Sequence, residues 1–130
     1  MSLNDKPLIL LAEDDESIAF LVQKQLEDCA RVHVATEVDE ALNKAEEQRY
    51  DAFLIDINLG FGKSGIDLLK SLRELPIYQS APIATLTAYS MTGDRERFLR
   101  EGFDYYVSKP FTKSELRLLV AEMVSTSACN

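Results

Sequence analysis

Short apolar runs alternate with helical patterns along almost the whole chain, and this alternation limits the possible folds more than any other feature of the sequence. The apolar runs are Leu8–Ala12, Val32–Ala35, Ala52–Ile55, Ile83–Leu86 and Tyr105–Val107. The first, third and fourth are almost continuously hydrophobic, which is typical of strands buried on both faces of a parallel sheet. Five strands alternating with five helices predict an α/β fold, a doubly wound (βα)5 domain with a five-stranded parallel sheet and helices on both faces.

The segments between the runs carry apolar residues at helical spacing. These stripes are Ile18, Leu21, Val22 and Leu26; Val38, Ala41, Leu42 and Ala45; Leu68, Leu69, Leu72 and Leu75; and Leu116, Leu119, Val120, Met123 and Val124. Pro76 predicts the end of the third helix. Thr112–Glu115 has the capping-box pattern that begins the last helix.

The segment Met91–Glu101 predicts a helix of a different kind. It offers only Met91, Phe98 and Leu99 for burial, and Gly102 suits its C-terminal cap. A helix with so narrow an apolar face is held weakly by packing. Two interpretations stay open: a plain surface helix, or a mobile element of a switch.

Length and composition predict one globular domain. The chain has 130 residues, of which 46% are hydrophobic and 28% charged. Its formal net charge of -8, without any run of Lys or Arg, argues against direct binding of nucleic acid. We expect residues 7–125 to form the domain, residues 1–6 to be an N-terminal extension or an expression remnant, and residues 126–130 to be a flexible tail.

The two cysteines, Cys29 and Cys129, give neither a disulfide framework nor a metal-binding spacing. We therefore expect a reduced, cytoplasmic protein. No apolar run approaches the length of a membrane span, and Met1–Leu3 lacks the basic start of a signal peptide. The sequence thus predicts no association with a membrane.

Polar side chains follow four of the five predicted strands. They are Glu13, Asp14 and Asp15 after the first run, Asp56 and Asn58 after the third, Thr87 after the fourth and Lys109 after the fifth. Ligands of open α/β sheets bind beyond the carboxyl ends of the strands. We therefore expect these side chains to meet in one site.

The residue types at this site favour phosphoryl transfer. Carboxylates of Glu13, Asp14 and Asp56 would repel one another unless a cation or protonation neutralised them, and hard oxygen ligands favour Mg²⁺. A carboxylate can attack phosphorus and form an aspartyl phosphate. Phosphoryl transfer needs mainly position and positive charge. Lys109 supplies a cation and Thr87 a hydroxyl donor.

Four motifs resemble the signature blocks of response regulator receiver domains, in that family's order and spacing. They are Leu11–Asp15, Leu54–Leu59, Leu86–Ala88 and Val107–Phe111. The resemblance covers the chain from Pro7 to about Val124. It implies the flavodoxin-like strand order 2-1-3-4-5. It also implies a phosphoacceptor module of a two-component phosphorelay, which receives its phosphoryl group from a histidine kinase or a histidine phosphotransfer protein.

The resemblance implies a role for each residue of the acidic cluster. Asp56 would accept the phosphoryl group. Asp14 would bind Mg²⁺ directly, and Glu13 would act largely through water. Asn58 would offer its backbone carbonyl to the metal, beside the carboxylate of Asp56.

The resemblance also implies how the phosphoryl group would be sensed. Thr87 would hydrogen-bond it and Lys109 would pair with it, while the Lys109–Pro110 peptide bond would be cis. Tyr106 would be the switch aromatic that turns inward when Thr87 moves. A downstream protein would then recognise the face made by the fourth helix, fifth strand and fifth helix. The phosphodonor would dock near Ile18–Val22, and homodimerisation through the fourth-helix face is left open.

Two features depart from the family's pattern. The loop Leu59–Gly65 lacks the proline common after the acceptor and is one residue longer than usual, so the conformation of Gly60–Gly65 is not carried over from the family. Tyr89, two residues after Thr87, is bulky at a position that tunes self-dephosphorylation together with Asn58. We hypothesise that Tyr89 slows the attack of water by crowding.

Simpler interpretations exist for single residues. Asp15 is interpreted equally well as a helix cap or as a residue of the site, and a capping role is also considered for Asp14 and Thr87. His33, the sole histidine, is interpreted as a sheet or surface side chain. Gly62–Ser64 resembles the end of a P-loop, but that motif needs a glycine at the position of Ile57, so nucleotide binding is disfavoured.

Two other classes of function stay open beside the phosphoacceptor module, which would not be an enzyme because it catalyses only its own phosphorylation and dephosphorylation. An aspartyl-phosphate phosphatase of the haloacid-dehalogenase type would want a second acid at Asn58. A degenerate receiver would bind partners without phosphorylation, and the intact set of Asp56, Asp14, Thr87 and Lys109 speaks against it.

Overall fold

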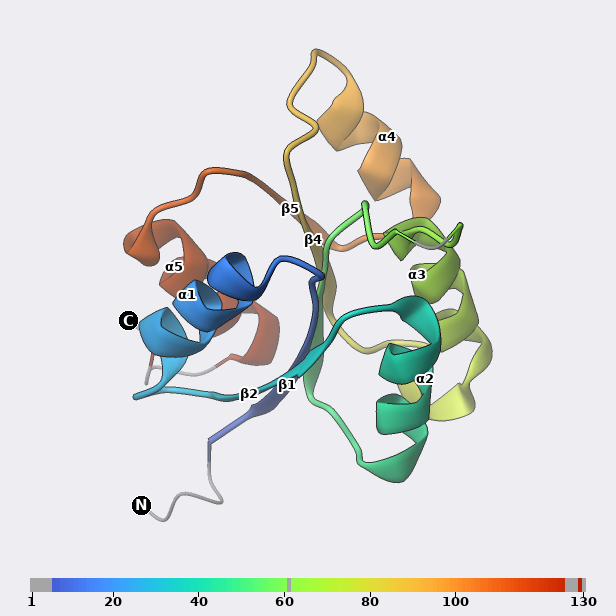
Figure 1. Cartoon of the computed structure of the whole chain (residues 1–130), viewed down its shortest axis with the longest axis horizontal. Helices are drawn as coiled ribbons and strands as arrows, with labels where there is room; N and C mark the ends of the chain where they lie inside the picture. Colours follow the sequence, from blue (N-terminus) through green and yellow to red (C-terminus); the bar gives the residue numbers. More distant parts are fainter. Residues whose placement is uncertain (1–5, 61, 126–128, 130) are drawn as a thin grey trace.

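The computed structural model describes residues 6–60, 62–125 and 129, and a parallel sheet lies at its centre (Figure 1). Its strands are β1 (Leu8–Ala12), β2 (Arg31–Ala35), β3 (Ala52–Ile55), β4 (Ile83–Thr87) and β5 (Tyr105–Ser108). Neighbouring strands pair in parallel in the order β2-β1-β3-β4-β5. The predicted fold and strand order are confirmed, and every strand boundary lies within one residue of its apolar run.

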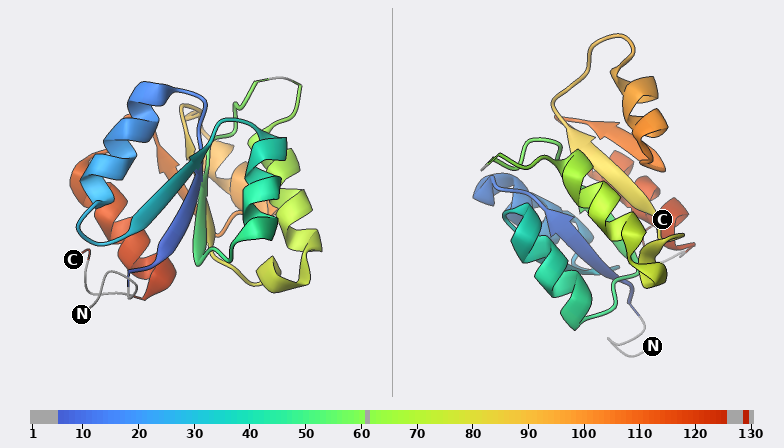
Figure 2. Two further views of the ribbon diagram at one scale, coloured as in Figure 1. Left: turned by 60° about the horizontal axis from the view of Figure 1, so that its bottom comes forward. Right: turned by 90° about the vertical axis from the view of Figure 1, so that its right-hand side faces the viewer.

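Helices cover both faces of the sheet (Figures 1 and 2). They are α1 (Glu16–Leu26), α2 (Val38–Glu47), α3 (Gly65–Glu74), α4 (Asp94–Glu101) and α5 (Lys113–Val124), with a short 3-10 helix, η2 (Pro76–Tyr78), directly after α3. The helices α1 and α5 share one face, and α2, α3 and α4 lie on the other. Alternate residues of the central strands therefore point into two separate apolar layers.

The two layers explain why β1 and β3 read as continuous apolar runs. Ile9 and Leu54 belong to the cluster under α1 and α5. Leu10 and Phe53, their neighbours in sequence, belong to the cluster under α2, α3 and α4. Because both faces are covered, no position of these strands is left for a solvated polar side chain.

Helix caps fix where the polypeptide leaves the carboxyl end of the sheet. The Asp15 carboxylate accepts hydrogen bonds from the backbone N–H groups of Ser17 and Ile18, so its interpretation as a cap is confirmed. The predicted capping box of Thr112 and Glu115 is present at the start of α5.

The helix expected over Met91–Glu101 begins three residues later than predicted. The Asp94 carboxylate accepts a hydrogen bond from the Met91 N–H, and Gly93 has a φ of +93°. A turn therefore replaces the first part of the expected helix. Met91 is 77% exposed, so its predicted burial is wrong, whereas Phe98 is fully buried.

The prediction of reduced cysteines is wrong for this structure, in which Cys29 and Cys129 form a disulfide with a Cα–Cα distance of 5.2 Å. The spacing of the two cysteines in the sequence did not predict this disulfide. They are 100 positions apart, and they meet in the apolar cluster where α1 packs against α5.

The expected terminal segments are described only in part. Residues 1–5, and residues 126–128 and 130 of the expected tail, lie outside the described residues. Lys6 donates a hydrogen bond to the Glu27 carbonyl, and Cys129 is buried. Within the described part of the chain, no helix has the length and apolarity to cross a membrane.

Candidate functional site

The sheet delivers the predicted polar residues to one rim. Glu13 and Asp14 follow the end of β1, Asp56 follows β3, Thr87 ends β4 and Lys109 follows β5. Backbone hydrogen bonds fix these strand ends: the Asp56 N–H donates to the Ala12 carbonyl at 2.9 Å, and the Lys109 N–H donates to the Thr87 carbonyl at 2.8 Å. The strand register therefore determines where each functional side chain begins.

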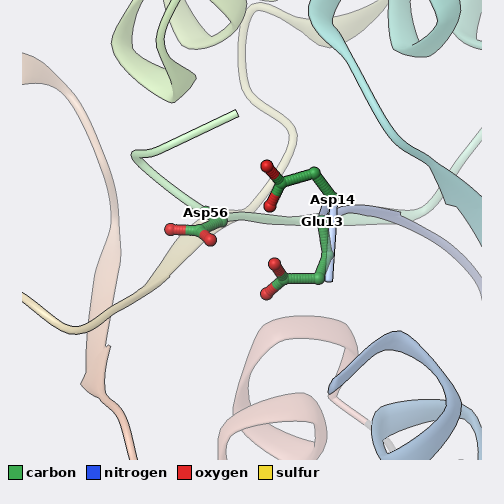
Figure 3. Close-up of side chains that lie close together, drawn as sticks. All are labelled: Glu13, Asp14 and Asp56. Atoms are coloured by element: carbon green, nitrogen blue, oxygen red, sulfur yellow. The ribbon is translucent and has the colours of Figure 1, made fainter. Parts of the chain in front are cut away.

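Three carboxylates gather at this rim (Figure 3). Glu13 and Asp14 leave the end of β1 in different directions, with Asp56 beside them. One oxygen from each of the three carboxylates lies within 4.8 Å of the others. Glu13 and Asp56 are buried, whereas Asp14 is exposed. Such a set of hard oxygen donors, open on one side to water, fits a divalent cation such as Mg²⁺.

Lys109 links the two buried acids. Its Nζ lies 2.6 Å from Glu13 Oε1 and 2.9 Å from Asp56 Oδ2. Burial lowers the pKa of Lys109, but the hydrogen bonds to Glu13 and Asp56 outweigh it, so the pKa is raised overall. The lysine therefore stays charged and holds the two acids together.

The acid Glu13 carries the largest electrostatic cost at the site. Burial, with a further contribution from the Asp56 charge, raises the pKa of Glu13 to about 7, although Lys109 acts in the opposite direction. Placing a second buried acid next to Asp56 is unfavourable unless positive charge is near. The rim is thus built to receive more positive charge than Lys109 alone provides.

The other half of the rim consists of hydroxyl groups. The Thr87 side-chain oxygen accepts a hydrogen bond from the Tyr89 N–H at 3.1 Å. This bond leaves the hydroxyl proton of Thr87 available for donation, because a hydroxyl accepts and donates separately. Thr87 is fully buried, so its side chain has to move before the hydroxyl can donate to a group placed above Asp56.

Tyr89 connects the two halves of the rim. Its phenol donates to the Asn58 side-chain oxygen at 3.3 Å, and the Asn58 N–H donates to Asp56 Oδ1 at 3.1 Å. The Tyr106 hydroxyl donates to the Tyr89 carbonyl. The sequence predicts a modulating role for Tyr89 and Asn58 but none of these hydrogen bonds, because they have no signature in the spacing of residues.

Aromatic packing joins Tyr89 and Tyr106 to α4. Ring centroids of Tyr89 and Phe98 are 5.9 Å apart, and Tyr106 stacks on Phe98 at 6.3 Å. The Arg97 guanidinium lies 4.4 Å from the Phe98 centroid and 5.6 Å from that of Tyr89. The predicted switch aromatic thus shares a small cluster with the one fully buried residue of α4.

The loop after Asp56 approaches the site closely. A Cβ on Gly65 would lie 2.2 Å from the Asp56 carbonyl oxygen, so glycine is required where α3 begins. Ser64 and Asp67 form a capping box at this start, and Lys63 Nζ lies 2.8 Å from Asp39 Oδ1. The sequence analysis predicts neither the capping box nor the ion pair, although Ser64 and Asp67 have the spacing of a capping box.

Three further predictions concern the Lys109–Pro110 bond, the segment that resembles a P-loop, and His33. The Lys109–Pro110 peptide bond is cis, as predicted. Lys63 and Ser64 are engaged by Asp39 and by the cap of α3, which agrees with rejecting a P-loop. His33 lies on β2, outside the site, as its assignment to a sheet position implies, and its Nδ1 is 2.9 Å from the Tyr50 hydroxyl.

A shallow apolar groove of about 360 Å³ adjoins the rim. It is lined by Ile18, Leu21, Ala88, Lys109, Pro110 and Phe111. Leu21 is 45% exposed, although α1 buries its opposite side in the core. Lys109 therefore stands between the acidic cluster and an apolar surface that is open to a partner.

Known proteins resemble the chain over most of its length. A phosphate regulon transcriptional regulatory protein, PhoB, of Rhizobium meliloti is 36% identical over 119 residues, which cover 91% of this chain and 52% of PhoB. An uncharacterised 14.6 kDa protein of Leptolyngbya boryana is 36% identical over 115 residues, 88% of this chain and 87% of that protein. The chain spans about half the length of the transcriptional regulators that it matches.

A solved structure matches the fold and is described with a bound metal. The receiver domain of the sensor histidine kinase PA1611 of Pseudomonas aeruginosa has a magnesium ion in its active-site cleft. Its TM-score is 0.83 at 31% identity, and the match covers 93% of this chain and 99% of that domain. The family described as response regulator receiver domain matches residues 9–121. With its strand order and rim of acids, this chain belongs to the response regulator receiver domain family.

Proposed function

We propose that this chain is a phosphoacceptor module in which Asp56 receives a phosphoryl group. The observation that carries the proposal is the contact of Lys109 with both Glu13 and Asp56, with the Asp14 carboxylate next to them. Charge of both signs is thereby concentrated around one carboxylate. Positioned charge is what phosphoryl transfer requires of a protein.

The donor in this proposal is a phosphohistidine on a histidine kinase or a histidine phosphotransfer protein. An Asp56 carboxylate oxygen attacks the phosphorus in line, a new P–O bond forms, and the P–N bond to histidine breaks. Lys109 turns toward the transferred oxygens, and the buried Thr87 hydroxyl donates to them. The imidazole leaves with the electron pair of the broken bond and takes up a proton.

Asp14, Asp56 and the Asn58 backbone carbonyl are the proposed direct ligands of Mg²⁺, and Glu13 is the fourth group of the proposed site, which would act largely through water. When bound, the ion supplies the positive charge that offsets the acids and the transferring phosphoryl oxygens. The geometry supports this assignment, because one oxygen from each of the three carboxylates lies within 4.8 Å of the others.

The proposed output is a change on the α4–β5–α5 face. Donation from Thr87 to a phosphoryl oxygen would move its side chain, which now accepts a bond from Tyr89. Tyr106 bonds to the Tyr89 carbonyl and would follow. Such coupling needs only a difference in interaction energy between two states of this aromatic cluster.

The phosphodonor is proposed to dock on the groove lined by Ile18, Leu21 and Phe111. A partner seated there would bring its phosphohistidine over Lys109 and Asp56. A downstream protein would bind the α4–β5–α5 face, where a homodimer is also proposed to form. We propose a cytoplasmic setting, no direct contact with nucleic acid or a membrane, and no enzymatic turnover of other substrates.

The two other function classes are less well supported. Asn58 stands where the phosphatase class would want a second acid, and its amide already accepts from Tyr89. A degenerate receiver has no need of Lys109 between two buried acids, an arrangement that costs stability.

Intact mass after incubation with phosphoramidate and Mg²⁺ tests the proposal. We expect one added phosphoryl group on the parent, none on Asp56→Asn, and none on the parent when EDTA removes Mg²⁺. Asp51→Asn is a matched control, since Asp51 lies at the other end of β3 and hydrogen-bonds the Leu8 N–H. An equal gain in the parent and in Asp56→Asn would refute the assignment.

A further inference from the structure

We propose that Cys29 and Cys129 form a reversible thiol–disulfide clamp, which fastens Cys129 to the turn that follows α1. The disulfide joins residues 100 positions apart. Cys29 lies two residues before Arg31, the first residue of β2, so the clamp lies at the amino end of the sheet, opposite the rim that carries Asp56. This inference goes beyond the phosphoacceptor function and does not depend on it.

The clamp is part of the layer formed by α1 and α5. Both cysteines belong to the apolar cluster that contains Val22 and Leu26 of α1 and Val120 of α5. Cys29 is 0% exposed and Cys129 is 2% exposed. The disulfide therefore lies in the layer where α1 and α5 already pack against each other, and it adds a covalent link to an apolar contact.

A second link at the same place is not reducible. Arg117 of α5 lies 2.6 Å from Asp28, the residue before Cys29, and also donates to the Gln25 carbonyl at 3.1 Å. The Arg117 guanidinium holds the pKa of Asp28 below its usual range. Because this pair and the apolar cluster remain after reduction, opening the disulfide would free Cys129 without separating α1 from α5.

The chemistry of the clamp is ordinary thiol–disulfide exchange. A dithiol reductant attacks one sulfur, the Sγ–Sγ bond breaks, and the reductant is itself oxidised to a disulfide. Two electrons and two protons reach the protein, leaving two thiols. A disulfide of the same class reverses the step. The preference for a switch over a fixed staple rests on the proposed cytoplasmic setting, because reductants are abundant there and paired cysteines are generally redox-active rather than permanent.

Burial of the two cysteines determines how fast a reductant can open the disulfide. Both cysteines are buried, so a reductant reaches the sulfurs only when the packing around them opens transiently, and exchange is slower than at an exposed disulfide. Closing a loop of about 100 residues strongly restricts the unfolded chain. The oxidised protein should therefore be much more resistant to unfolding than the reduced one.

The test uses the full chain in glutathione buffers of graded redox ratio, with alkylation to count thiols by mass and thermal unfolding in each buffer. We expect no reactive thiols after equilibration with oxidised glutathione and two after treatment with dithiothreitol. Reduction should lower Tm by roughly 10 °C. Cys129→Ala should unfold near the Tm of the reduced parent in both buffers, and Cys29→Ala should behave likewise.

Three results would overturn the clamp. They are two reactive thiols in the folded protein under oxidising buffer, a Tm unchanged by reduction, and a disulfide that excess dithiothreitol cannot reduce while the protein is folded. The phosphoramidate assay separates this proposal from the function above. The clamp predicts equal phosphorylation of the oxidised and reduced protein, while failure in both states would refute only the phosphoacceptor function.

Discussion

The two halves of the rim are held together by different forces. The acidic half contains Glu13, Asp14 and Asp56, and the charge of Lys109 binds two of these acids at distances below 3 Å. The hydroxyl half contains Thr87, Tyr89 and Tyr106, joined by neutral hydrogen bonds. Charged hydrogen bonds are roughly twice as strong as neutral ones. One half is therefore built to stay in place and the other to move.

Exposure follows this division at three residues, because Glu13 is 1% and Asp56 6% exposed, while Tyr89 is 40% exposed. It does not follow the division at Asp14, which is exposed, or at Thr87, which is fully buried. Weakly packed, solvent-exposed groups change state at little cost, and switch elements are drawn from such regions. We therefore assign the chemistry to the acidic half and the signalling to the hydroxyl half.

The largest effect is expected for Lys109→Gln. The substitution removes the cation shared by Glu13 and Asp56, and loss of one electrostatic stabiliser typically slows a reaction by about 10²–10³-fold. The initial rate of mass gain from phosphoramidate should fall by about 100-fold or more. Lys113→Gln, at an exposed lysine of α5, should keep the parental rate. Similar rates for both variants would remove Lys109 from the chemistry.

A pH effect should follow from Glu13, whose pKa rises from 4.5 to about 7 on folding. The folded state therefore holds a proton more tightly than the unfolded state, and stability is lost as pH rises from 4.5 through 7. Without metal, Glu13→Gln should be the more stable protein at pH 8, by up to about 3 kcal/mol relative to the difference at pH 4.5.

Urea unfolding of the parent and Glu13→Gln in EDTA at several pH values measures this difference. Taking the difference between the two proteins cancels the opposite contribution of His33, whose pKa is lowered by burial. If the free energies of unfolding of the two proteins change in parallel with pH, the pKa of Glu13 is not raised on folding. Saturating Mg²⁺ should reduce the gap at pH 8.

A smaller effect is expected at Tyr89, which spans both halves. If its ring crowds the approach of water, Tyr89→Ala should shorten the lifetime of the aspartyl phosphate by about threefold or more, equivalent to roughly 0.7 kcal/mol. Tyr89→Phe keeps the ring against Phe98 and should keep most of the lifetime. Intact mass spectrometry over time measures the decay of the aspartyl phosphate in each protein. Equal lifetimes for the parent and both variants would refute the crowding hypothesis.

The smallest effect is expected for Tyr106→Phe, which removes only the bond to the Tyr89 carbonyl. One neutral hydrogen bond contributes about 1 kcal/mol. The free energy of unfolding should fall by no more than this, and the rate of phosphorylation should not change. A large loss of phosphorylation in this variant would break the division between the two halves.

The fold and the acidic half were predictable because local rules determine them. Apolar runs such as Leu8–Ala12 and Ala52–Ile55, set between helical patterns, are typical of central strands of a covered sheet, and the residues after such strands reach one rim. Asp56 and Lys109 are therefore placed by strand position alone. The sequence, without any distance, was enough to bring them together.

The remaining features depend on contacts between distant segments. The Cys29–Cys129 pairing arises from packing of α1 against α5, and the bond from Tyr89 to Asn58 joins the ends of β4 and β3. The late start of α4 depends on one bond from Met91 to the Asp94 carboxylate, which competes with helical geometry. Periodicity cannot report such contacts, because it describes only one segment at a time.

The most direct test of the central claim is to map the phosphoryl group on the chain. The parent would be phosphorylated with phosphoramidate and Mg²⁺, treated with borohydride, which reduces an acyl phosphate to an alcohol, and digested for peptide mass spectrometry. We predict one modified residue, Asp56 converted to homoserine, and no such product at Asp14 or Asp51. Modification at another carboxylate, or none in a protein that has gained the phosphoryl mass, would contradict the account.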